Sequence, residues 1–473
     1  MQFCSQKFVL FFLLIFALYW TLPGRRMRVW LLLGASFYFY ASWNKLLALL
    51  ICVSTLLDYL LALGMERSIV NWQRKLLLCV SLFANLGLLC YFKYANFFLE
   101  SLDEVLIAAG ATTWFNTLHV LLPVGISFYT FEAINYTIDV YRRRIPAERN
   151  LGDFMLFILF FPHLVAGPIV RAKDFLPQIK RPKRWDWPRM HLGMGYVLMG
   201  LVKKMAIADH MAEYVDPVFA DPSAFRASAI VFAIVAYAVQ IYCDFSGYTD
   251  IAIGLAHMLG YKLARNFNMP YLSANITDFW RRWHISLSSW LRDYLFIPLG
   301  GSRDGRWRTA RNLMITMALG GLWHGASWTF VFWGVLHGML LVVHRLFRGF
   351  IEPRPLLDRA LRSLPGTALR MLMTFLCVAV GWVFFRAATF GTAWTLLQRV
   401  AEWSPGLGTP LPRLSLVSTL AFMWVCHAAA CWLPWKKMWR VPAPIQGFAY
   451  AAALVLAQVL APDAGKAFIY FQF

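Results

Sequence analysis

Apolar positions come in long blocks: runs of about 17–25 mostly apolar residues recur along the chain, separated by short polar loops. Each run is long enough to cross a bilayer as a helix. The pattern predicts helices at about 8–22, 29–43, 46–64, 76–92, 119–138, 192–208, 228–243, 368–386, 415–433 and 444–460. We therefore expect an all-α polytopic membrane protein, with residues 1–473 as a single integral-membrane domain. The first run is expected to stay as a helix, because no small-residue cleavage site follows it.

Basic residues in the loops set the expected orientation, because cytoplasmic loops carry an excess of Lys and Arg. The loops at 25–28 and 142–144 are basic, whereas the stretch 100–104 is acidic and is expected as an outer loop. Basic residues at 436–440 precede the last predicted helix. This alternation predicts a multi-pass membrane protein with both termini on the side away from the cytoplasm, which is the periplasm if, as the resemblance given below implies, the membrane is the bacterial inner (cytoplasmic) membrane.

One apolar stretch, residues 151–170, departs from this alternation. Basic residues flank it on both sides, so both of its ends are expected in the cytoplasm. It also contains Pro162, Gly167 and Pro168, which disfavour a straight helix. We expect a re-entrant or interfacial segment, since irregular backbone at membrane depth is tolerated only where protein or a water-filled cavity covers it.

Two further stretches are irregular. Residues 244–311 form the most polar long region, and its short apolar pieces at 251–260 and 294–299 suit helices lying at the cytoplasmic side. Apolar residues 312–344 are interrupted at Gly320-Gly321 and have basic residues at both ends. That stretch fits either a hairpin or broken helix inside the membrane or one tilted span.

Composition narrows the function classes. The chain is 60% hydrophobic and 15% charged, which excludes an ordinary soluble domain. Its net charge of +21 lies largely in short loops, so the positive-inside bias and attraction to anionic lipid explain it better than nucleic acid does. The eight cysteines form no C-x-x-C and are expected to pack as small apolar residues. Neither a metal site nor a bound cofactor is expected.

His324 is the strongest candidate for chemistry. It lies in GLWHGASWTFVFWG, between Trp323 and Trp328, in a run too apolar for water. An ionisable group at membrane depth is costly and is a functional candidate by default. Nearby glycines leave room for a substrate, and a neutral imidazole can take a proton from a hydroxyl. The alternative is a hydrogen-bonded structural histidine, the role expected for six others: His119, His163, His257, His337, His344 and His427.

His284, in FWRRWHISLSSWLRDYLF, is the second candidate. Its tryptophan and arginine neighbours are typical either of membrane anchors or of a positively charged mouth for an anionic, phosphate-bearing donor. Asp244 and Asp250 lie six residues apart and do not share one helical face well, so caps and local hydrogen bonds are expected there. The candidates for binding the donor or lining a tunnel are Trp323, Arg281, Arg282, Trp283, Asp244 and Ser286.

Several long strings resemble the membrane-bound O-acyltransferase family. The motif core, 240–334, holds QIYCDFSGYTDIAIG, NFNMPYLSANITDFWRRWHISLSSWLRDYLFIPLGG and GGLWHGASWTFVFWG. Others are YFKYANFF, LPVGISFYTFEAINYTIDVYR, FFPHLVAGPIVR and the final FIYFQF. The chain is most similar to the bacterial branch that contains the alginate and cellulose O-acetylation proteins and the D-alanyl transferase of teichoic acid.

The resemblance implies about eleven transmembrane helices, with re-entrant or interfacial helices, around a central funnel or tunnel. It implies that His324 and His284 are the catalytic histidines. Acetyl from acetyl-CoA in the cytoplasm would pass across the inner membrane to a periplasmic or membrane-anchored partner that acetylates an exopolysaccharide, alginate- or cellulose-like. Two alternatives stay open: D-alanyl transfer to teichoic acid from a carrier protein, and a transporter or flippase without chemistry. The second lacks the internal repeat that it predicts.

Overall fold

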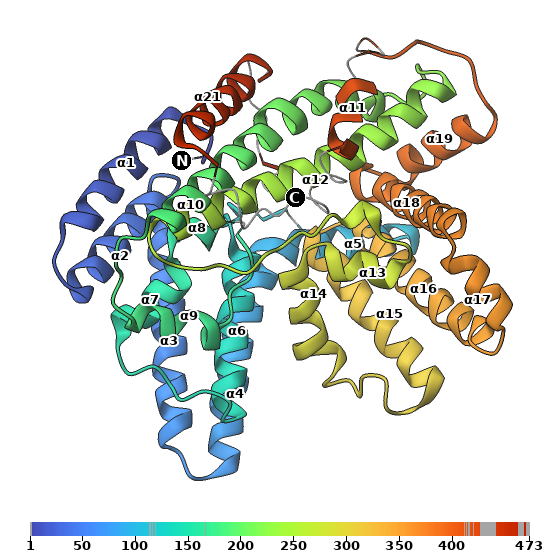
Figure 1. Cartoon of the computed structure of the whole chain (residues 1–473). Coiled ribbons are helices and arrows are strands. Elements are labelled where there is room, and N and C mark those ends of the chain that lie inside the picture. The colour runs from blue at the N-terminus through green and yellow to red at the C-terminus, as the bar shows by residue number, and fades with distance from the viewer. Residues whose placement is uncertain are drawn as a thin grey trace. The chain divides into compact units, whose positions relative to one another are not determined.

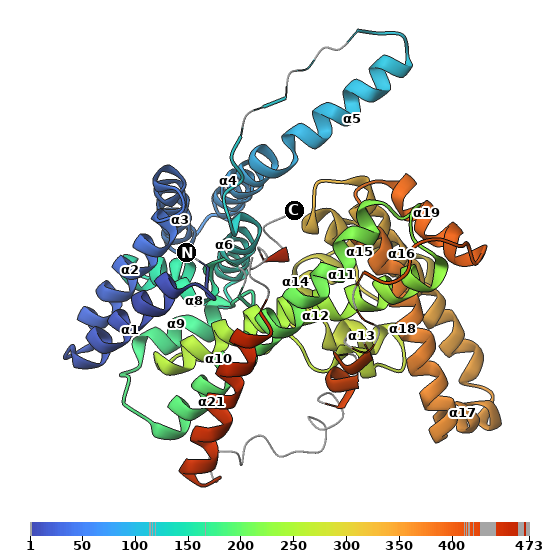
Figure 2. The same ribbon diagram turned by 90° about the horizontal axis from the view of Figure 1, so that it is seen from above.

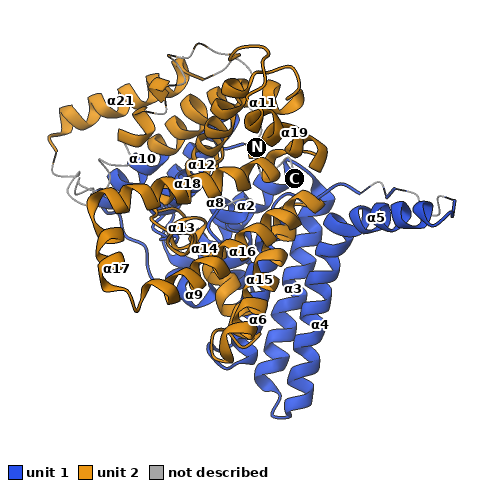
Figure 3. Cartoon of the chain, turned by 90° about the vertical axis from the view of Figure 1, so that its right-hand side faces the viewer, with its two compact units in different colours: residues 1–197, 249–264 blue, residues 198–248, 265–473 orange. Residues whose placement is uncertain are grey.

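The computed structural model of the chain describes residues 2–112, 115, 117, 118, 120–165, 167–410, 412, 414, 417–419, 421–425, 441–461, 468 and 469. Over these residues the regular structure is helical (Figure 1). The helices fall into two compact units (Figure 3): residues 1–197 with 249–264, and residues 198–248 with 265–473. The single membrane domain expected from the sequence stays a prediction.

The first unit is built from α1 to most of α10 and the end of α12. Its helices are α1 Gln6–Thr21, α2 Arg25–Ala41, α3 Lys45–Arg67, α4 Asn71–Leu89, a π-helical turn Cys90–Tyr94, α5 Ala95–Ala108, α6 Ile126–Tyr141, α7 Leu151–Leu159, α8 Phe161–Leu164, α9 Ala172–Lys180 and α10 Trp187–Leu201. Helices α3 and α4 lie side by side as an antiparallel pair (Figure 1).

The acidic stretch 100–104 is helical, so its prediction as a loop is wrong. It belongs to α5, which continues α4 through the π-helical turn and extends away from the rest of this unit (Figure 2). The physical reason is plain in the sequence: neither glycine nor proline occurs between Gly87 and Gly110. Gly110, with φ at 90°, follows the end of the helix.

The irregularity predicted for 151–170 is confirmed. The stretch forms two short helices: Asn150 caps α7, Pro162 lies in the first turn of α8, and residues 167–170 are non-helical. Gly167 packs so closely that an added Cβ would lie 2.4 Å from the Cα of His163. The membrane face at which this stretch enters and leaves stays a prediction.

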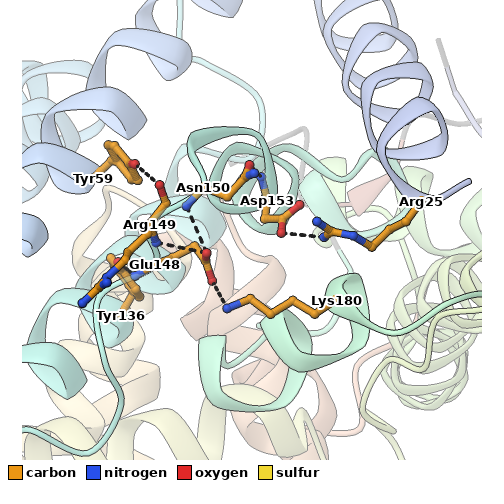
Figure 4. A network of polar contacts seen from close by, with 8 residues as sticks. All are labelled: Arg25, Tyr59, Tyr136, Glu148, Arg149, Asn150, Asp153 and Lys180. Carbon is orange, nitrogen blue, oxygen red and sulfur yellow. Dashed lines mark hydrogen bonds and ion pairs between the residues drawn. The ribbon is translucent and has the colours of Figure 1, made fainter.

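Ion pairs and hydrogen bonds fasten this stretch to its neighbours in the same unit (Figure 4). Arg25 of α2 pairs with Asp153 of α7 at 2.7 Å, and Lys180 of α9 pairs with Glu148 at 2.7 Å. Glu148 also accepts a hydrogen bond from the backbone N–H of Asn150 at 3.1 Å. The network ties the start of α2 to the broken helices.

The second unit holds the motif core. After α10 come a π-helical segment Val202–Ala208, α11 Asp209–Ala220, α12 Ala227–Met258, a 3-10 turn Pro270–Leu272, α13 Ile276–Arg282, α14 Ile285–Leu291, a π-helical turn Arg292–Phe296, α15 Gly305–His324, α16 Trp328–Ile351, α17 Pro355–Arg362, α18 Leu364–Arg386, α19 Phe390–Ala401 and α21 Ala443–Val459.

Helix α12 corrects two expectations. It runs 32 residues without a break, past the end predicted at about residue 243 and through the DFSGYTD string, and it absorbs most of the apolar piece 251–260, which was expected as a separate short helix. Asp244 is therefore in mid-helix and caps nothing. Its charge is tolerated because Lys204 lies 2.6 Å away.

Residues 312–344 form a helical hairpin, α15 and α16, instead of one tilted span. The chain turns at residues 325–327, and Gly320-Gly321 lie inside α15, so the break was predicted a few residues too early. The glycines permit close helix contact: a Cβ on Gly321 would lie 2.2 Å from the carbonyl oxygen of Phe330, and a Cβ on Gly334 would lie 2.2 Å from that of Met317.

The all-α, multi-pass character is confirmed. Within the described residues, five helical stretches are long and apolar enough to cross a membrane: Lys45–Arg67, Asn71–Ala108, Ala227–Met258, Trp328–Ile351 and Leu364–Arg386. Shorter apolar helices are Gln6–Thr21 and Ala443–Val459. Most of the predicted helix 415–433, the loop 436–440, His119 and His427 lie outside the described residues. The total of about eleven crossings and the central funnel stay predictions.

Candidate active site

The two candidate histidines, 40 residues apart in sequence, come together in the second unit. Their ring centroids lie 6.3 Å apart. His324 is the last residue of α15 and His284 is the residue before α14, so each ring is held at a helix end. Both side chains are buried: the residues are 2% and 0% exposed. The structure thus assembles the pair that the sequence predicted.

The backbone at His284 adopts a conformation that L-residues usually avoid. Its φ is 43° and its ψ is 54°, in the left-handed region. This conformation costs roughly 1–2 kcal/mol for a residue with a Cβ, and such strain concentrates at functional sites. Here it turns the chain sharply between α13, which ends at Arg282, and α14, which begins at Ile285. The turn places the imidazole inside the unit.

Asn266 fixes the tautomer of His284. Its Oδ1 accepts a hydrogen bond from the backbone N–H of Ser286 at 3.2 Å, which identifies this atom as the oxygen of the amide. The same oxygen accepts from the Ser286 hydroxyl at 2.9 Å and lies 3.1 Å from Nδ1 of His284. Nδ1 facing an acceptor must carry a hydrogen, so the lone pair of neutral His284 is at Nε2.

Aromatic rings enclose both imidazoles. Phe245 packs edge-on against His284 at 4.7 Å, and Trp323 contacts both histidine rings, at 5.9 Å and 5.1 Å. Trp333 and Phe385 pack against His324 at 5.1 Å and 5.3 Å. These distances join ring centroids. Such surroundings exclude water, and charge interactions between buried groups are stronger there than in water.

His284 is neutral at physiological pH. It lies outside the five candidate membrane spans, and burial lowers its pKa to about 3. Desolvation disfavours the charged imidazolium, so the ring offers a lone pair and not an extra proton. Two buried imidazoles next to each other can accept a proton from a hydroxyl and hold reacting groups in place.

Asp244 joins the site through its neighbours. Its carboxylate pairs with Lys204, which also pairs with Asp209 at 2.7 Å, and it accepts a hydrogen bond from the backbone N–H of Ile469 at 2.7 Å. Phe468, beside Ile469, packs against Phe245 at 5.9 Å between ring centroids. Asp244 therefore holds residues 468–469 against the ring that contacts His284.

Comparisons with known proteins show the family of this chain. Residues 141–382, about half of the chain, match the membrane-bound O-acyltransferase family. The chain belongs to this family. Both histidines and Asn266 lie within the matched residues. It is an O-acyltransferase, and this excludes a transporter without chemistry.

Among its relatives, this O-acyltransferase is 43% identical over 419 residues to the probable alginate O-acetylase AlgI of Pseudomonas aeruginosa, covering 88% of this chain and 78% of that protein. It is 36% identical over 400 residues to a peptidoglycan O-acetyltransferase of Helicobacter pylori, covering 78% and 73%. A teichoic acid D-alanyltransferase of Bacillus subtilis is 28% identical over 287 residues, covering 56% and 69%.

Of the other predicted site residues, some lie at the histidine pair and the rest have other surroundings. Trp323 and Ser286 lie at the histidine pair of this acyltransferase, as described above. Trp283 is 1% exposed and packs on the ring of Phe267, so it is a buried core residue and its alternative as a membrane anchor is wrong. Arg282 pairs with Asp278 at 2.9 Å, and Arg281 is exposed. Their part in donor binding stays a prediction.

Of the histidines expected to be hydrogen-bonded structural residues, His337 and His344 form such bonds, whereas His163 lies beside a carboxylate and His257 stacks on a ring. His163 lies 3.3 Å from a Glu132 carboxylate oxygen, and His344 lies 3.0 Å from the Thr277 hydroxyl. Trp280 donates to Nδ1 of His337 at 3.3 Å. The ring of His257 stacks on Tyr196.

Asn266 was missed as a functional residue. It opens the string NFNMPYLSANITDFW that carries part of the family resemblance, so a signal was present. No local pattern separates it from the second asparagine in that string, Asn268, because its role comes from a contact with a residue 18 positions away.

Proposed function

We propose that this enzyme moves an acetyl group from cytoplasmic acetyl-CoA across the inner membrane, for O-acetylation of an exopolysaccharide by a periplasmic or membrane-anchored partner. Family membership and the names of two relatives, an alginate O-acetylase and a peptidoglycan O-acetyltransferase, support acetyl as the group moved. The high identity to the first over 88% of the chain favours an alginate-like polymer over a cellulose-like one.

The observation that carries the proposed chemistry is the buried pair of histidines. His324 acts as general base: it takes the proton of the acceptor hydroxyl as that oxygen attacks the thioester carbonyl. The carbon–sulfur bond then breaks, and the thiolate leaves as coenzyme A, which takes up a proton. The aromatic enclosure keeps water from competing for the acetyl group.

His284 is better suited to positioning the donor than to polarising the thioester carbonyl. A second histidine beside a general base can do one of two things: position the donor, or donate a hydrogen bond to the thioester carbonyl. With its hydrogen at Nδ1 facing Asn266, neutral His284 presents a lone pair at Nε2 and cannot donate from that atom. We therefore assign it to holding a reacting group by accepting a hydrogen bond.

The alternative acyl group is D-alanine, delivered by a carrier protein. A D-alanyltransferase relative supports it, with lower identity over a smaller part of the chain. The test uses the purified protein in lipid nanodiscs with acetyl-CoA labelled in the acetyl group. We expect thioester cleavage or transfer of label to a hydroxyl acceptor. Absence of both, with turnover of a D-alanyl carrier protein, would favour the alternative.

A further inference from the structure

A small basic pocket lies in the first unit, apart from the residues discussed above as catalytic. Its volume is about 150 Å³. Four segments form it: the end of α1, the start of α2, the loop after α9 and the loop after α12. We call it the basic pocket; its polar lining consists of Tyr19, Gly24, Arg25, Arg28, Lys183 and Tyr261.

The pocket carries an excess of positive charge. Of its three cations, Arg25 is paired with Asp153. Arg28 donates to the carbonyl oxygens of Leu22 and Lys183, at 3.0 Å and 2.9 Å, and Lys183 donates to that of Gln178 at 2.7 Å. Carbonyl groups orient these cations without neutralising them. Within the described part of the chain neither Arg28 nor Lys183 is paired with a carboxylate, so the pocket is suited to an anion.

Burial and neighbouring positive charges both disfavour the protonated amine of Lys183. Burial, together with the nearby Arg189 and Arg181, lowers its pKa to about 8. The lysine lies in a loop outside the candidate membrane spans. A bound anion would offset this unfavourable environment, because an opposite charge nearby favours the protonated amine.

The backbone at the start of α2 also favours binding of an anion. Helix α2, 17 residues long, begins beside the pocket; its N-cap Gly24 has φ at 80°, and the helix start has no side-chain cap and no acidic residue in its first turn. Exposed N–H groups at a helix start attract anions. The Tyr19 hydroxyl is a further polar group of the lining: the residue is 0% exposed, and its hydroxyl interacts with the side chains of Tyr261 and Arg28, which line the same pocket.

We propose that the basic pocket binds a phosphate group at the cytoplasmic face of the membrane. Two guanidinium groups, an ammonium group, a phenol and a helix start supply the donors that a phosphate oxygen accepts. The cytoplasmic assignment follows from the basic residues of 25–28, at the start of α2, and of 180–184, at and after the end of α9. The phosphate belongs either to an anionic phospholipid headgroup or to a soluble phosphate-bearing donor. The proposal does not depend on which acyl group the enzyme transfers.

The first experiment measures phosphate binding by thermal unfolding of the purified protein in phosphatidylcholine nanodiscs. Inorganic phosphate is titrated against chloride at matched ionic strength. The test variant is Lys183→Gln, which can still donate to the Gln178 carbonyl. Its matched control is Arg184→Gln, an adjacent and exposed residue that does not line the pocket and loses the same charge. Arg28→Gln with the exposed control Arg26→Gln repeats the comparison.

We expect phosphate to raise the unfolding temperature of the wild type and of both controls. Its affinity should fall about tenfold or more in each pocket variant, the loss that corresponds to one charge-assisted hydrogen bond. An equal response in pocket and control variants, or no response in the wild type, would overturn the proposal. If Arg28→Gln does not fold, the pair Lys183→Gln and Arg184→Gln still decides the outcome.

Two further arms identify the source of the phosphate. In nanodiscs of phosphatidylcholine and phosphatidylglycerol in equal parts, native mass spectrometry counts the phosphatidylglycerol that stays bound. Retention by the wild type and loss in Lys183→Gln assigns the pocket to a lipid headgroup. Protection by adenosine 3′,5′-bisphosphate in pure phosphatidylcholine, absent in Lys183→Gln, assigns it to a soluble donor. If neither effect is observed, the proposal that the pocket is a physiological phosphate site is overturned.

Discussion

Asn266→Ala removes the one side-chain oxygen that three donors around His284 share. The Ser286 hydroxyl can rotate toward another acceptor, but the Ser286 N–H and the Nδ1–H of His284 are fixed and buried. An unsatisfied buried donor costs about 1–3 kcal/mol, so we expect a stability loss of about 2–6 kcal/mol. That is a large part of the roughly 5–15 kcal/mol typical of a folded protein.

Activity should fall as well, because His284 loses the partner that selects its tautomer. We expect acyl transfer per folded molecule to drop by between about 10-fold and about 10,000-fold, the range found when a functional histidine loses its orienting partner. The assay follows coenzyme A release, normalised to folded protein from size-exclusion chromatography.

Asn266→Asp separates positioning from simple structural support. It keeps an acceptor for the same donors, so it should retain more folded protein than Asn266→Ala. Its carboxylate favours the charged imidazolium and raises the pKa of His284. A raised pKa means that the neutral ring is lost at a higher pH, so the acid limb of the pH–activity profile should move to higher pH. Unchanged activity in Asn266→Ala, or an unmoved pH profile in Asn266→Asp, would refute the reasoning.

Two other predictions follow from the fold, and two on membrane topology follow from the basic residues of the sequence. Gly321→Ala should sharply reduce the yield of folded protein in detergent, since its Cβ would lie 2.2 Å from the Phe330 carbonyl oxygen; normal yield would contradict the packing of α15 on α16. Asp244→Asn leaves Lys204 paired with Asp209 alone, so it should destabilise the protein in thermal or denaturant unfolding by less than the roughly 3–5 kcal/mol of a fully broken buried pair; an unchanged midpoint would show that the pair with Asp244 contributes little. Cysteine probes on the two flanks of residues 151–170 should both be labelled from the cytoplasm; labelling of the two flanks from opposite sides would restore a plain transmembrane helix. Cysteine probes at both chain ends should be labelled from the periplasm.

Much of the helical arrangement could be predicted, because long apolar runs dictate membrane helices regardless of distant contacts. The runs at 46–64 and 368–386 correspond to α3 and α18, with ends shifted by a few residues. The broken stretch 151–170 was also predictable, since Pro162 and Gly167 disfavour a straight helix wherever they lie. Local residue chemistry was sufficient in these cases.

The helical state of 100–104 was readable from the local sequence, but three other misses share a cause: the deciding contact is remote in sequence. The helix was predicted to end at residue 243, just before Asp244, but Lys204, 40 residues earlier, pairs with this carboxylate and makes its place inside α12 possible. Gly320-Gly321 resembled a break, but Gly321 serves close packing against α16, and Gly320 faces Leu291 of α14. The site shows the same division: both histidines stood out from their apolar neighbours, whereas Asn266 is recognisable only from its contact with His284.

The most direct test of the proposed chemistry is the acyl-transfer rate per folded molecule of His324→Ala. General-base assistance is typically worth about 100- to 10,000-fold, so the variant should insert and fold while losing at least that factor. The control is His344→Ala, which removes another histidine, half-buried and hydrogen-bonded to Thr277, and should keep its activity per folded molecule. The double variant His284→Ala/His324→Ala should lose activity by a factor much smaller than the product of the two single-variant factors, because the two residues serve one transition state. A His324→Ala protein with near-normal activity per folded molecule would contradict the catalytic assignment.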